Sequence, residues 1–266
     1  MTIITLLTDF GIEDYYVGAV KGVLASRAPG TTLIDISHQV PPGEIDTATF
    51  LLQAAAPSFP AGTVHLAVVD PGVGTSRRCL AVAVDDAYFV APDNGLLTPF
   101  VTHGEVVAVD RTDLDLATPR GHRPSHTFHG RDRFAPIAAA LATGTRLTEL
   151  GPRIDDAIVT DRPRPRREEG ALVGHVVHID RFGNAVTDIP ATWLPMGPVV
   201  AEIAGIRVDR RVVTYDELPD DRPGLLIGSL QTVELSFKGK SFAALQNIAK
   251  GMQVSILNAL PQRSLD

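Results

Sequence analysis

The sequence contains one cysteine, Cys79, and no long hydrophobic run. A single thiol cannot close a disulfide within the chain and lacks the repeated spacing of a zinc site, so a reducing cytoplasm is the expected setting. No apolar stretch approaches the roughly 18 residues that a membrane span needs. The apolar run at residues 3–7 is too short for a signal peptide and has no basic segment before it. These absences predict a cytoplasmic protein that does not enter a membrane.

The chain also lacks an excess of basic residues and the glycine motifs of nucleotide-binding loops. It has 24 Lys and Arg against 31 Asp and Glu, a net charge of −7, which argues against binding to nucleic acid. Neither GxGxxG nor GxxxxGK followed by Ser or Thr occurs. What is present, 44% hydrophobic and 21% charged residues, is typical of a soluble globular protein.

The first 160 residues alternate between strand-like and helix-like segments. Apolar runs at 3–7, 32–36 and 64–69 are separated by two segments with helical spacing, the first after an expected N-cap at Asp14 and the second over 45–54. This alternation predicts a parallel sheet with helices on both faces. Further strands are expected at 80–84, 88–90 and 106–109, and an alanine-rich helix at 134–141.

Residues 161–170, DRPRPRREEG, hold two prolines, many charges and no apolar anchor, and we interpret them as a linker. Beyond them, strand-like segments follow without long helices, at 171–179, 199–203, 211–215, 224–227, 232–235 and 252–257. The predicted organisation is an α/β domain with a mainly parallel sheet over 1–160 and a small all-β domain, a barrel or a sandwich, over 171–266.

Ligands of parallel sheets bind beyond the carboxyl ends of the strands, which directs attention to Asp9 and Asp70. Either carboxylate can hold a ribose or orient a partner, or simply cap the following turn. Arg77 is near enough in sequence to pair with Asp70, in a functional site or on the surface. His129, between Phe128 and an expected helix, is a candidate general base or a structural histidine.

Two further groups of residues have the chemistry of binding sites. His122, His126 and His129 lie close in sequence, but their spacing fits no zinc motif, so no metal is predicted. Residues 180–184, Asp-Arg-Phe-Gly-Asn, follow a strand and offer a carboxylate, an aromatic face and a carboxamide. These groups suit an amine, an adenine ring and its polar edge, and they equally suit a polar hairpin turn.

Taken together, four motifs resemble those of the S-adenosyl-L-methionine (SAM) hydroxide adenosyltransferases, which are adenosine-forming SAM hydrolases related to the SAM-dependent fluorinase and chlorinase. The motifs are Leu7-Thr8-Asp9-Phe10-Gly11, Val69-Asp70-Pro71-Gly72-Val73-Gly74-Thr75, Phe128-His129-Gly130-Arg131-Asp132 and Asp180-Arg181-Phe182-Gly183-Asn184. The resemblance covers almost the whole chain. It implies an N-terminal α/β domain, a C-terminal β-barrel and a homotrimer that binds SAM between the N-terminal domain of one subunit and the C-terminal domain of its neighbour.

The resemblance also implies roles for individual residues. The catalytic set falls on Asp70, Arg77 and His129. In the halide-using relatives, the position that resembles Asp70 holds a tyrosine instead. Substrate contacts fall on Asp9 and Asp14 near the ribose and nucleophile, Asp180 at the methionine amine, Phe182 and Asn184 at the adenine, and Ser229 at the methionine end. Residues 228–233, Gly-Ser-Leu-Gln-Thr-Val, depart from the pattern Asn-Ser-x-Gly-x-Leu, and Phe237-Lys238-Gly239 occupies a stretch that gives adenine its backbone contacts.

The implied reaction is hydrolysis of SAM to adenosine and L-methionine, with no cofactor, by attack of activated water on the ribose C5′. In this interpretation His129 accepts a proton from the water, Arg77 stabilises hydroxide character and Asp70 fixes Arg77. Retention of all three residues favours water over halide as the nucleophile. A SAM-dependent halogenase, a SAM or adenosine sensor without turnover and a metal-dependent hydrolase are the alternatives.

Overall fold

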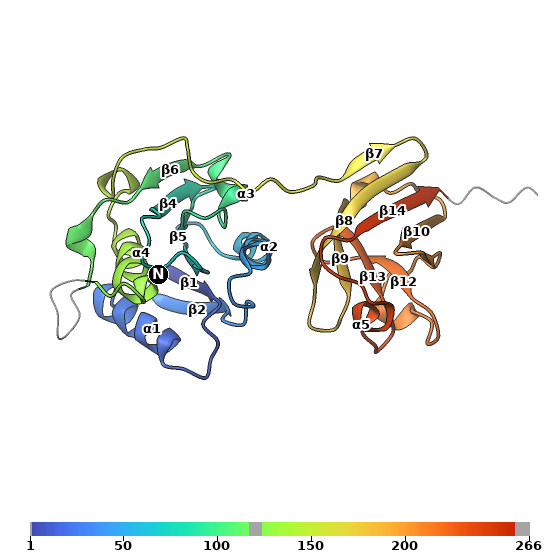
Figure 1. Cartoon of the computed structure of the whole chain (residues 1–266), viewed down its shortest axis with the longest axis horizontal. Helices are drawn as coiled ribbons and strands as arrows, with labels where there is room; N and C mark the ends of the chain where they lie inside the picture. The colour runs from blue at the N-terminus through green and yellow to red at the C-terminus, as the bar shows by residue number, and fades with distance from the viewer. Residues whose placement is uncertain (1, 117–123, 259–266) are drawn as a thin grey trace, which may run out of the picture. The chain divides into compact units, whose positions relative to one another are not determined.

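A computed structural model describes residues 2–116 and 124–258 of the chain. The chain divides into two compact units, Met1–Thr160 and Asp161–Asp266 (Figure 1). Each unit buries hydrophobic clusters of its own residues. The two units are therefore described separately.

The first unit is built on a six-stranded sheet with the order β2-β1-β3-β5-β4-β6. The pairs β2–β1, β1–β3 and β3–β5 are parallel, and β4 runs antiparallel to both of its neighbours. The strands are β1 (Ile3–Thr8), β2 (Thr32–Ser37), β3 (Val64–Val68), β4 (Cys79–Val84), β5 (Ala87–Pro92) and β6 (Glu105–Ala108). The prediction of a mainly parallel sheet is confirmed, with β4 as the reversed strand.

Helices cover both faces of this sheet (Figure 1). The helices α1 (Tyr16–Arg27) and α4 (Ala135–Ala142) pack on one face against Ile4 and Leu6 of β1, whereas α2 (Ile45–Ala55) packs on the other against Leu7. This arrangement follows from the alternation of side chains along a strand. The shorter elements of the unit are η1 (Ala56–Ser58), α3 (Thr98–Val101), η2 (Thr112–Leu114), the π-helix η3 (Gly130–Phe134) and η4 (Leu147–Glu149).

Two details of the helix predictions are wrong. Tyr15, not Asp14, is the N-cap residue of α1, and its side chain makes no capping hydrogen bond. Asp14 lies one residue earlier, exposed in a bend. Phe134 ends the π-helix η3 instead of beginning α4.

The second unit is an all-antiparallel, barrel-like arrangement with the strand order β11-β10-β14-β8-β9-β13-β12, and β7 pairs with β8. The long strand β8 pairs with β14 along its first part and with β9 along its last part, with a register shift between Val176 and His178. The strands of the second unit are β7 (Arg166–Glu168), β8 (Ala171–Ile179), β9 (Ala185–Pro190), β10 (Val199–Ile203), β11 (Ile206–Val208), β12 (Gly224–Ile227), β13 (Thr232–Ser236) and β14 (Gln253–Asn258). The predicted barrel-like β fold is confirmed.

Some strand positions in this unit differ from expectation. Residues 211–215 form no strand, because Arg211 makes only an isolated bridge to Leu225 and Tyr215 begins the turn η6 (Tyr215–Glu217). The strand β7 lies within the segment expected to be a linker, and β9 and β11 were not anticipated. The remaining elements are η5 (Ala191–Trp193) and α5 (Phe242–Gln246).

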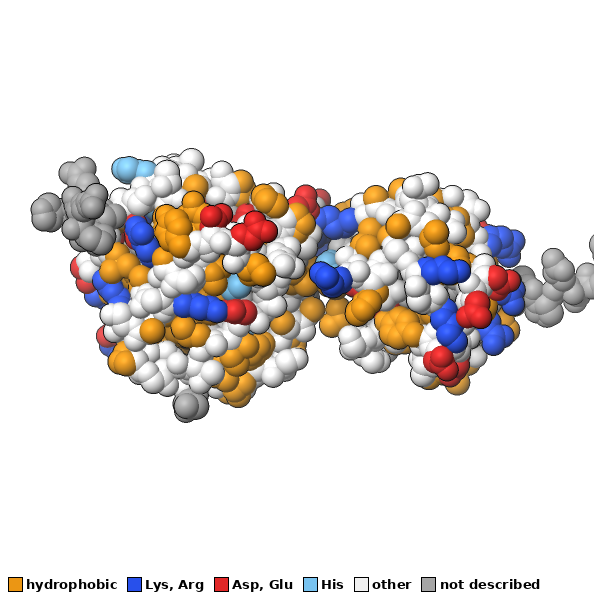
Figure 2. Space-filling view, turned by 90° about the horizontal axis from the view of Figure 1, so that it is seen from below, with side chains coloured by type: hydrophobic (Ala, Val, Ile, Leu, Met, Phe, Trp, Pro, Cys, Tyr) orange, Lys and Arg blue, Asp and Glu red, His pale blue; other side chains and the backbone are white. Residues whose placement is uncertain are grey.

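The surface charges are mixed in sign. On the face drawn in Figure 2, Lys and Arg side chains are interspersed with Asp and Glu. Within the described residues, no helix has the length and apolar character needed to cross a membrane.

Candidate active site

Two of the predicted carboxylates meet at the carboxyl ends of β1 and β3. Asp9 follows β1, Asp70 lies two residues beyond β3, and the backbone N–H of Gly43 donates to Asp9 Oδ2 at 2.9 Å. Burial raises the pKa of Asp9, the Gly43 hydrogen bond opposes this, and the nearby charge of Asp70 adds to the increase. The sheet thus brings together two acids that are distant in sequence.

The motif around His129 packs against both of these loops. A Cβ on Gly130 would lie 2.9 Å from Cζ of Phe10, so only glycine lets the Phe10 ring approach this closely. A Cβ on Gly74, at φ +82°, would lie 2.4 Å from the carbonyl oxygen of His126. These two close approaches hold three segments of the chain at one edge of the sheet.

Asp70, Arg77 and His129 form one hydrogen-bonded cluster. The Arg77 Nε donates to Asp70 Oδ1 and Oδ2 at 2.9 and 3.0 Å, and Arg77 Nη2 donates to Asp70 Oδ2 as well. Arg77 Nη2 also lies 2.8 Å from His129 Nδ1. The guanidinium therefore joins the carboxylate to the imidazole.

The contact with Arg77 fixes the protonation of His129. A guanidinium can only donate hydrogen bonds, so Nδ1 is the acceptor and the proton of the neutral ring is on Nε2. Burial lowers the pKa of His129, and the positive charges of Arg77 and Arg133 lower it further. His129 is neutral near pH 7, with Nε2–H free of the Arg77 contact.

The cluster is shielded from solvent. The Asp70 and Arg77 side chains are 6% and 8% exposed, and the guanidinium carbon of Arg77 lies 4.9 Å from the centre of the Phe134 ring. Burial alone would lower the pKa of Arg77, but hydrogen bonding and charge attraction from Asp70 hold it above its ordinary value. Burial raises the pKa of the adjacent Cys79 thiol, which keeps it protonated and poorly reactive.

An aromatic group borders the loop that carries Asp9. The Phe128 ring meets Phe10 and Tyr16 edge-on, with centroids 5.9 and 5.1 Å apart, and Arg131 lies over it at 4.9 Å. Tyr15, 65% exposed, contacts the same ring at 6.3 Å. These rings form an apolar, partly exposed surface next to the loop that carries Asp9.

The remaining predicted residues lie in the second unit, where Asp180 organises its own turn. Its Oδ1 accepts from the backbone N–H groups of Phe182 and Asn184 at 2.9 and 2.8 Å, and its Oδ2 accepts from Asn184 Nδ2 at 2.9 Å. The Phe182 side chain is 76% exposed. The predicted polar turn is present, and it presents an aromatic ring to solvent next to a fixed carboxamide.

Glycine is required at the centre of this turn. Gly183 has φ +83°, and a Cβ there would lie 1.9 Å from Ser241 Oγ and 2.7 Å from Ser241 Cα. Ser241 is the N-cap of α5, and its Oγ accepts from the Ala244 N–H at 3.0 Å. The Gly183 carbonyl accepts from the Ala243 N–H at 2.9 Å, so the turn and the helix start support each other.

We expect Gly183→Ala to lower the free energy of unfolding of the second unit by about 3 kcal/mol, because left-handed strain adds to a clash. Gly170→Ala is the matched control, since Gly170 has φ +74° with open space around it, and should cost about 1 kcal/mol. Urea unfolding followed by fluorescence of Trp193, which lies in the same unit, measures both. Equal losses in the two variants would contradict the role given to Ser241.

Ser229, Phe237 and Gly239 lie on turns beside β12 and β13. Ser229 is exposed in the turn that joins these strands, where the Gln231 N–H donates to the Gly228 carbonyl at 3.0 Å. The Phe237 side chain is buried in the core against Phe242, which leaves only its backbone for a ligand. Gly239, at φ +62°, forms the tip of the next turn. Gln231, in the same turn as Ser229, adopts a left-handed conformation at φ +59°.

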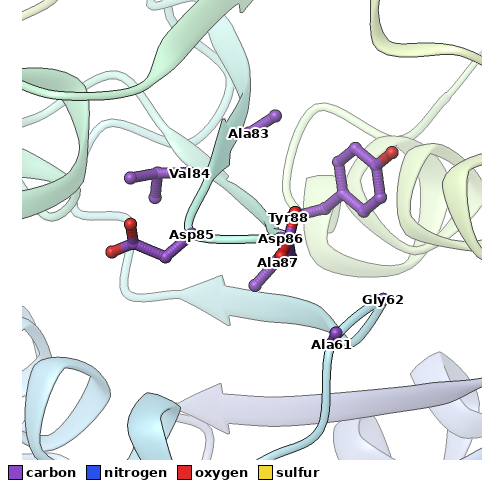
Figure 3. Close-up of a pocket in the computed structure, with 8 residues that line it drawn as sticks. All are labelled: Ala61, Gly62, Ala83, Val84, Asp85, Asp86, Ala87 and Tyr88. Atoms are coloured by element: carbon purple, nitrogen blue, oxygen red, sulfur yellow. The ribbon is translucent and has the colours of Figure 1, made fainter.

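A hollow in the first unit lies away from this cluster. A shallow depression of about 570 Å³ lies beside the turn between β4 and β5 and is lined by Ala61, Gly62, Ala83, Val84, Asp85, Asp86, Ala87 and Tyr88 (Figure 3). It contains none of the predicted site residues. Across residues 2–116 and 124–258, no three His, Cys, Asp or Glu side chains gather as metal ligands, and His122 lies outside these ranges.

Comparison with known families matches both units. Residues 4–151 match the SAM hydroxide adenosyltransferase N-terminal domain, and residues 174–255 match the C-terminal domain of the same family. The chain belongs to the SAM hydroxide adenosyltransferase family. The resemblance inferred from four sequence motifs is confirmed.

Curated relatives of this adenosyltransferase-family chain include the (R)-S-adenosyl-L-methionine hydrolase of Thermus thermophilus. It is 40% identical over 260 residues, covering 94% of this chain and 98% of that protein. The enzyme of the same name from Salinispora tropica is 38% identical, covering 95% and 97%. The fluorinase of Nocardia brasiliensis is more distant, at 31% identity over 72% of each chain. A crystal structure of an uncharacterized conserved protein from Thermotoga maritima superposes with a TM-score of 0.88 at 32% identity, covering 96% of this chain and 99% of that one.

Residues that no sequence motif singled out form a hydrogen-bonded support next to Asp9. Thr8 Oγ1 lies 2.8 Å from His38 Nδ1, and His38 Nε2 lies 3.0 Å from Asp35 Oδ1. His38 follows the apolar strand β2, so the rule that selected Asp9 and Asp70 also applies to it. Its partner Thr8 lies inside the first motif, but its hydroxyl is buried and gives no signal in the sequence.

Proposed function

We propose that this protein hydrolyses SAM to adenosine and L-methionine. The observation that carries the proposal is the buried Asp70–Arg77–His129 cluster at the carboxyl edge of the sheet, in a chain of this family. The relatives of similar length named (R)-S-adenosyl-L-methionine hydrolase support the same reaction.

In the proposed reaction, a water oxygen attacks the ribose C5′ in line with the departing methionine sulfur. The C–O bond forms as the C–S bond breaks, the bonding pair goes to sulfur, and the one proton that the water loses passes to solvent, which balances the positive charge of the sulfonium. The sulfonium is already a good leaving group, so the protein does not need to protonate it. The enzyme must instead hold one water in line, exclude others and stabilise hydroxide character on it.

The geometry of the cluster suggests a division of these tasks. The charged Arg77 supplies a positive field for the developing hydroxide, and Asp70 fixes the guanidinium through its forked hydrogen bonds. His129 Nδ1 is occupied by Arg77, so we assign His129 as a donor to the water through Nε2–H. This assignment replaces the proton-accepting role that the sequence alone suggested for this histidine.

A pair of variants separates these two roles of His129. We expect His129→Gln to keep turnover within about tenfold of wild type, because its amide N–H can take the place of Nε2–H, whereas His129→Ala loses about 10²-fold. Steady-state kinetics with SAM measure both variants. An equal loss of turnover in the two variants would indicate that His129 acts as a general base and not as a hydrogen-bond donor.

We further propose that Asp9 and Asp14 hold the ribose, Asp180 the methionine amine, Phe182 and Asn184 the adenine, Ser229 the methionine end, and the Phe237–Gly239 backbone the adenine edge. The resemblance supports a homotrimer in which neighbouring subunits share each substrate, with neither metal nor cofactor. The polar turn at Asp180 and the exposed Phe182 ring are consistent with these roles. Sedimentation analysis tests the trimer.

The deciding experiment is incubation of the protein with SAM in ¹⁸O-labelled water with a chelator present. Adenosine labelled at its 5′ oxygen, together with methionine, is the expected result. Unlabelled adenosine would exclude water attack at C5′, and loss of activity with the chelator would indicate a metal. A 5′-chloro nucleoside formed in added chloride would indicate a halogenase, and tight SAM binding without products would indicate a sensor.

A further inference from the structure

The Thr8–Gly11 segment, which carries Asp9, is held at both ends by one buried histidine. His38 has 4% of its side chain exposed, and its Nδ1 contacts the Thr8 hydroxyl at 2.8 Å. The His38 carbonyl accepts from the Gly11 N–H at 2.8 Å. The Thr8 hydroxyl in turn accepts from the Phe10 N–H at 3.3 Å. A single residue of the neighbouring strand end therefore contacts both ends of this four-residue segment.

The outer end of this group is an ion pair between Lys21 and Asp35. Lys21 Nζ donates to Asp35 Oδ2 at 2.6 Å, and His38 Nε2 faces Asp35 Oδ1. Burial alone would raise the pKa of Asp35, but hydrogen bonds from Lys21 and His38 hold it below its ordinary value. The ionised carboxylate only accepts, so the ring nitrogen that faces it, Nε2, carries a proton. The Thr8 hydroxyl pairs with the other ring nitrogen, Nδ1.

We propose that His38 and Thr8 are positioning residues for the SAM site, because they fix the backbone between Thr8 and Gly11 and thereby place Asp9 and Phe10. This inference rests on the proposed function for its catalytic consequence and on the hydrogen bonds alone for its structural part. A hydrogen-bonded support of this kind is needed because a carboxylate that orients substrate must stay within about 0.5 Å of its productive position.

The same strand contains a matched control. Thr5 Oγ1 lies 2.8 Å from His65 Nδ1, and both residues are fully buried, so this is a second Thr–His pair of the same chemistry. It lies in the middle of β1 and contacts His65 of β3, away from the Thr8–Gly11 segment. Thr5→Val and Thr8→Val remove equivalent hydroxyl groups with little change of volume, and only the second removes a contact to the site segment.

The first test measures amide hydrogen exchange by NMR in the full chain, and it does not depend on any activity. In Thr8→Val and His38→Leu, we expect the Phe10 and Gly11 amides to exchange about tenfold or more faster than in wild type, and in Thr5→Val to remain within twofold. Thr8→Ser keeps the hydroxyl and should restore protection. Unchanged exchange at Phe10 and Gly11 in both site variants would overturn the positioning role.

The second test measures SAM kinetics of the same variants. We expect Thr8→Val to lower kcat/KM about tenfold, with most of the change in KM, and Thr5→Val to leave both constants within twofold. Equal kinetic losses in Thr5→Val and Thr8→Val would mean that the loss comes from general destabilisation of the fold, and this would overturn the inference. Absence of SAM cleavage by the wild type would instead contradict the proposed function, while the exchange data would still decide the positioning role.

Discussion

We expect replacement of Arg77 by methionine to lower kcat for SAM hydrolysis by about 10²–10³-fold, which is the usual loss when one group that stabilises transition-state charge is removed. Arg77 is the central member of the buried cluster, with contacts to Asp70 and His129. Methionine preserves much of the volume against Phe134 but provides neither charge nor donors. The affinity for SAM, measured by calorimetry, should change much less than kcat.

The same substitution leaves Asp70 buried without its cation, which can cost about 3–5 kcal/mol of folding stability. The double variant Asp70→Asn/Arg77→Met removes both charges and should recover most of that stability without recovering kcat. Arg77→Lys keeps the charge but loses the forked geometry, so we expect an intermediate kcat. If the double variant regained activity, the role of Arg77 would be structural.

We expect the first unit to lose about 2 kcal/mol of folding stability between about pH 7 and pH 5 through protonation of His65 in the unfolded chain. Burial lowers the pKa of His65 to about 4 from an ordinary value of 6.5. The unfolded chain therefore binds a proton at His65 between these two pH values while the folded chain does not. The contribution of His65 to the free energy of unfolding is fully present above its pKa in the unfolded chain. It decreases as the pH falls towards its pKa in the folded chain.

The contribution of His65 is isolated by comparing variants at the two pH values. The ring stacks on Phe89 with centroids 4.8 Å apart and meets Phe59 edge-on, so His65→Phe keeps an aromatic ring there and removes the titrating group. It also removes the contact of Nδ1 with the Thr5 hydroxyl, a loss that is the same at both pH values. Urea unfolding followed by circular dichroism should show a weaker pH dependence in this variant, by about 2 kcal/mol. His103→Gln, at an exposed histidine, should retain the wild-type dependence, and an equal slope in His65→Phe would contradict the prediction.

The sequence predicts the sheet and its helices well, because buried strands appear as apolar runs and helices as spaced apolar residues. It predicts the short strands of the second unit less well. β11 has three residues, and residues 211–215 have the composition of a strand but bend into η6, where the Tyr215 hydroxyl contacts the buried Glu234. That contact joins positions far apart in the chain, and no local pattern encodes it.

The candidate site shows the same division between local and distant information. Asp9, Asp70 and the turn at Asp180 follow from the rule that polar residues after strands are placed at a sheet edge or a hairpin. The hydrogen bond from Arg77 to His129 does not follow from it, and the protonation of His129 depends entirely on that bond. The supporting pair of Thr8 and His38 is likewise visible only once the strands are in register.

The reversed strand β4 has a consequence for how the cluster assembles during folding. Because β4 runs against β5, its first residue pairs with the last residue of β5, so Arg77 lies at the edge where β1 and β3 end. Asp70 and Arg77 thus belong to one connection and are separated by seven positions, whereas Arg77 and His129 are separated by 52. Closing the short loop costs less chain entropy than closing the long one. Within the cluster, the ion pair is therefore the contact that costs little chain entropy, and the contact with His129 is the one that depends on the fold of the whole unit.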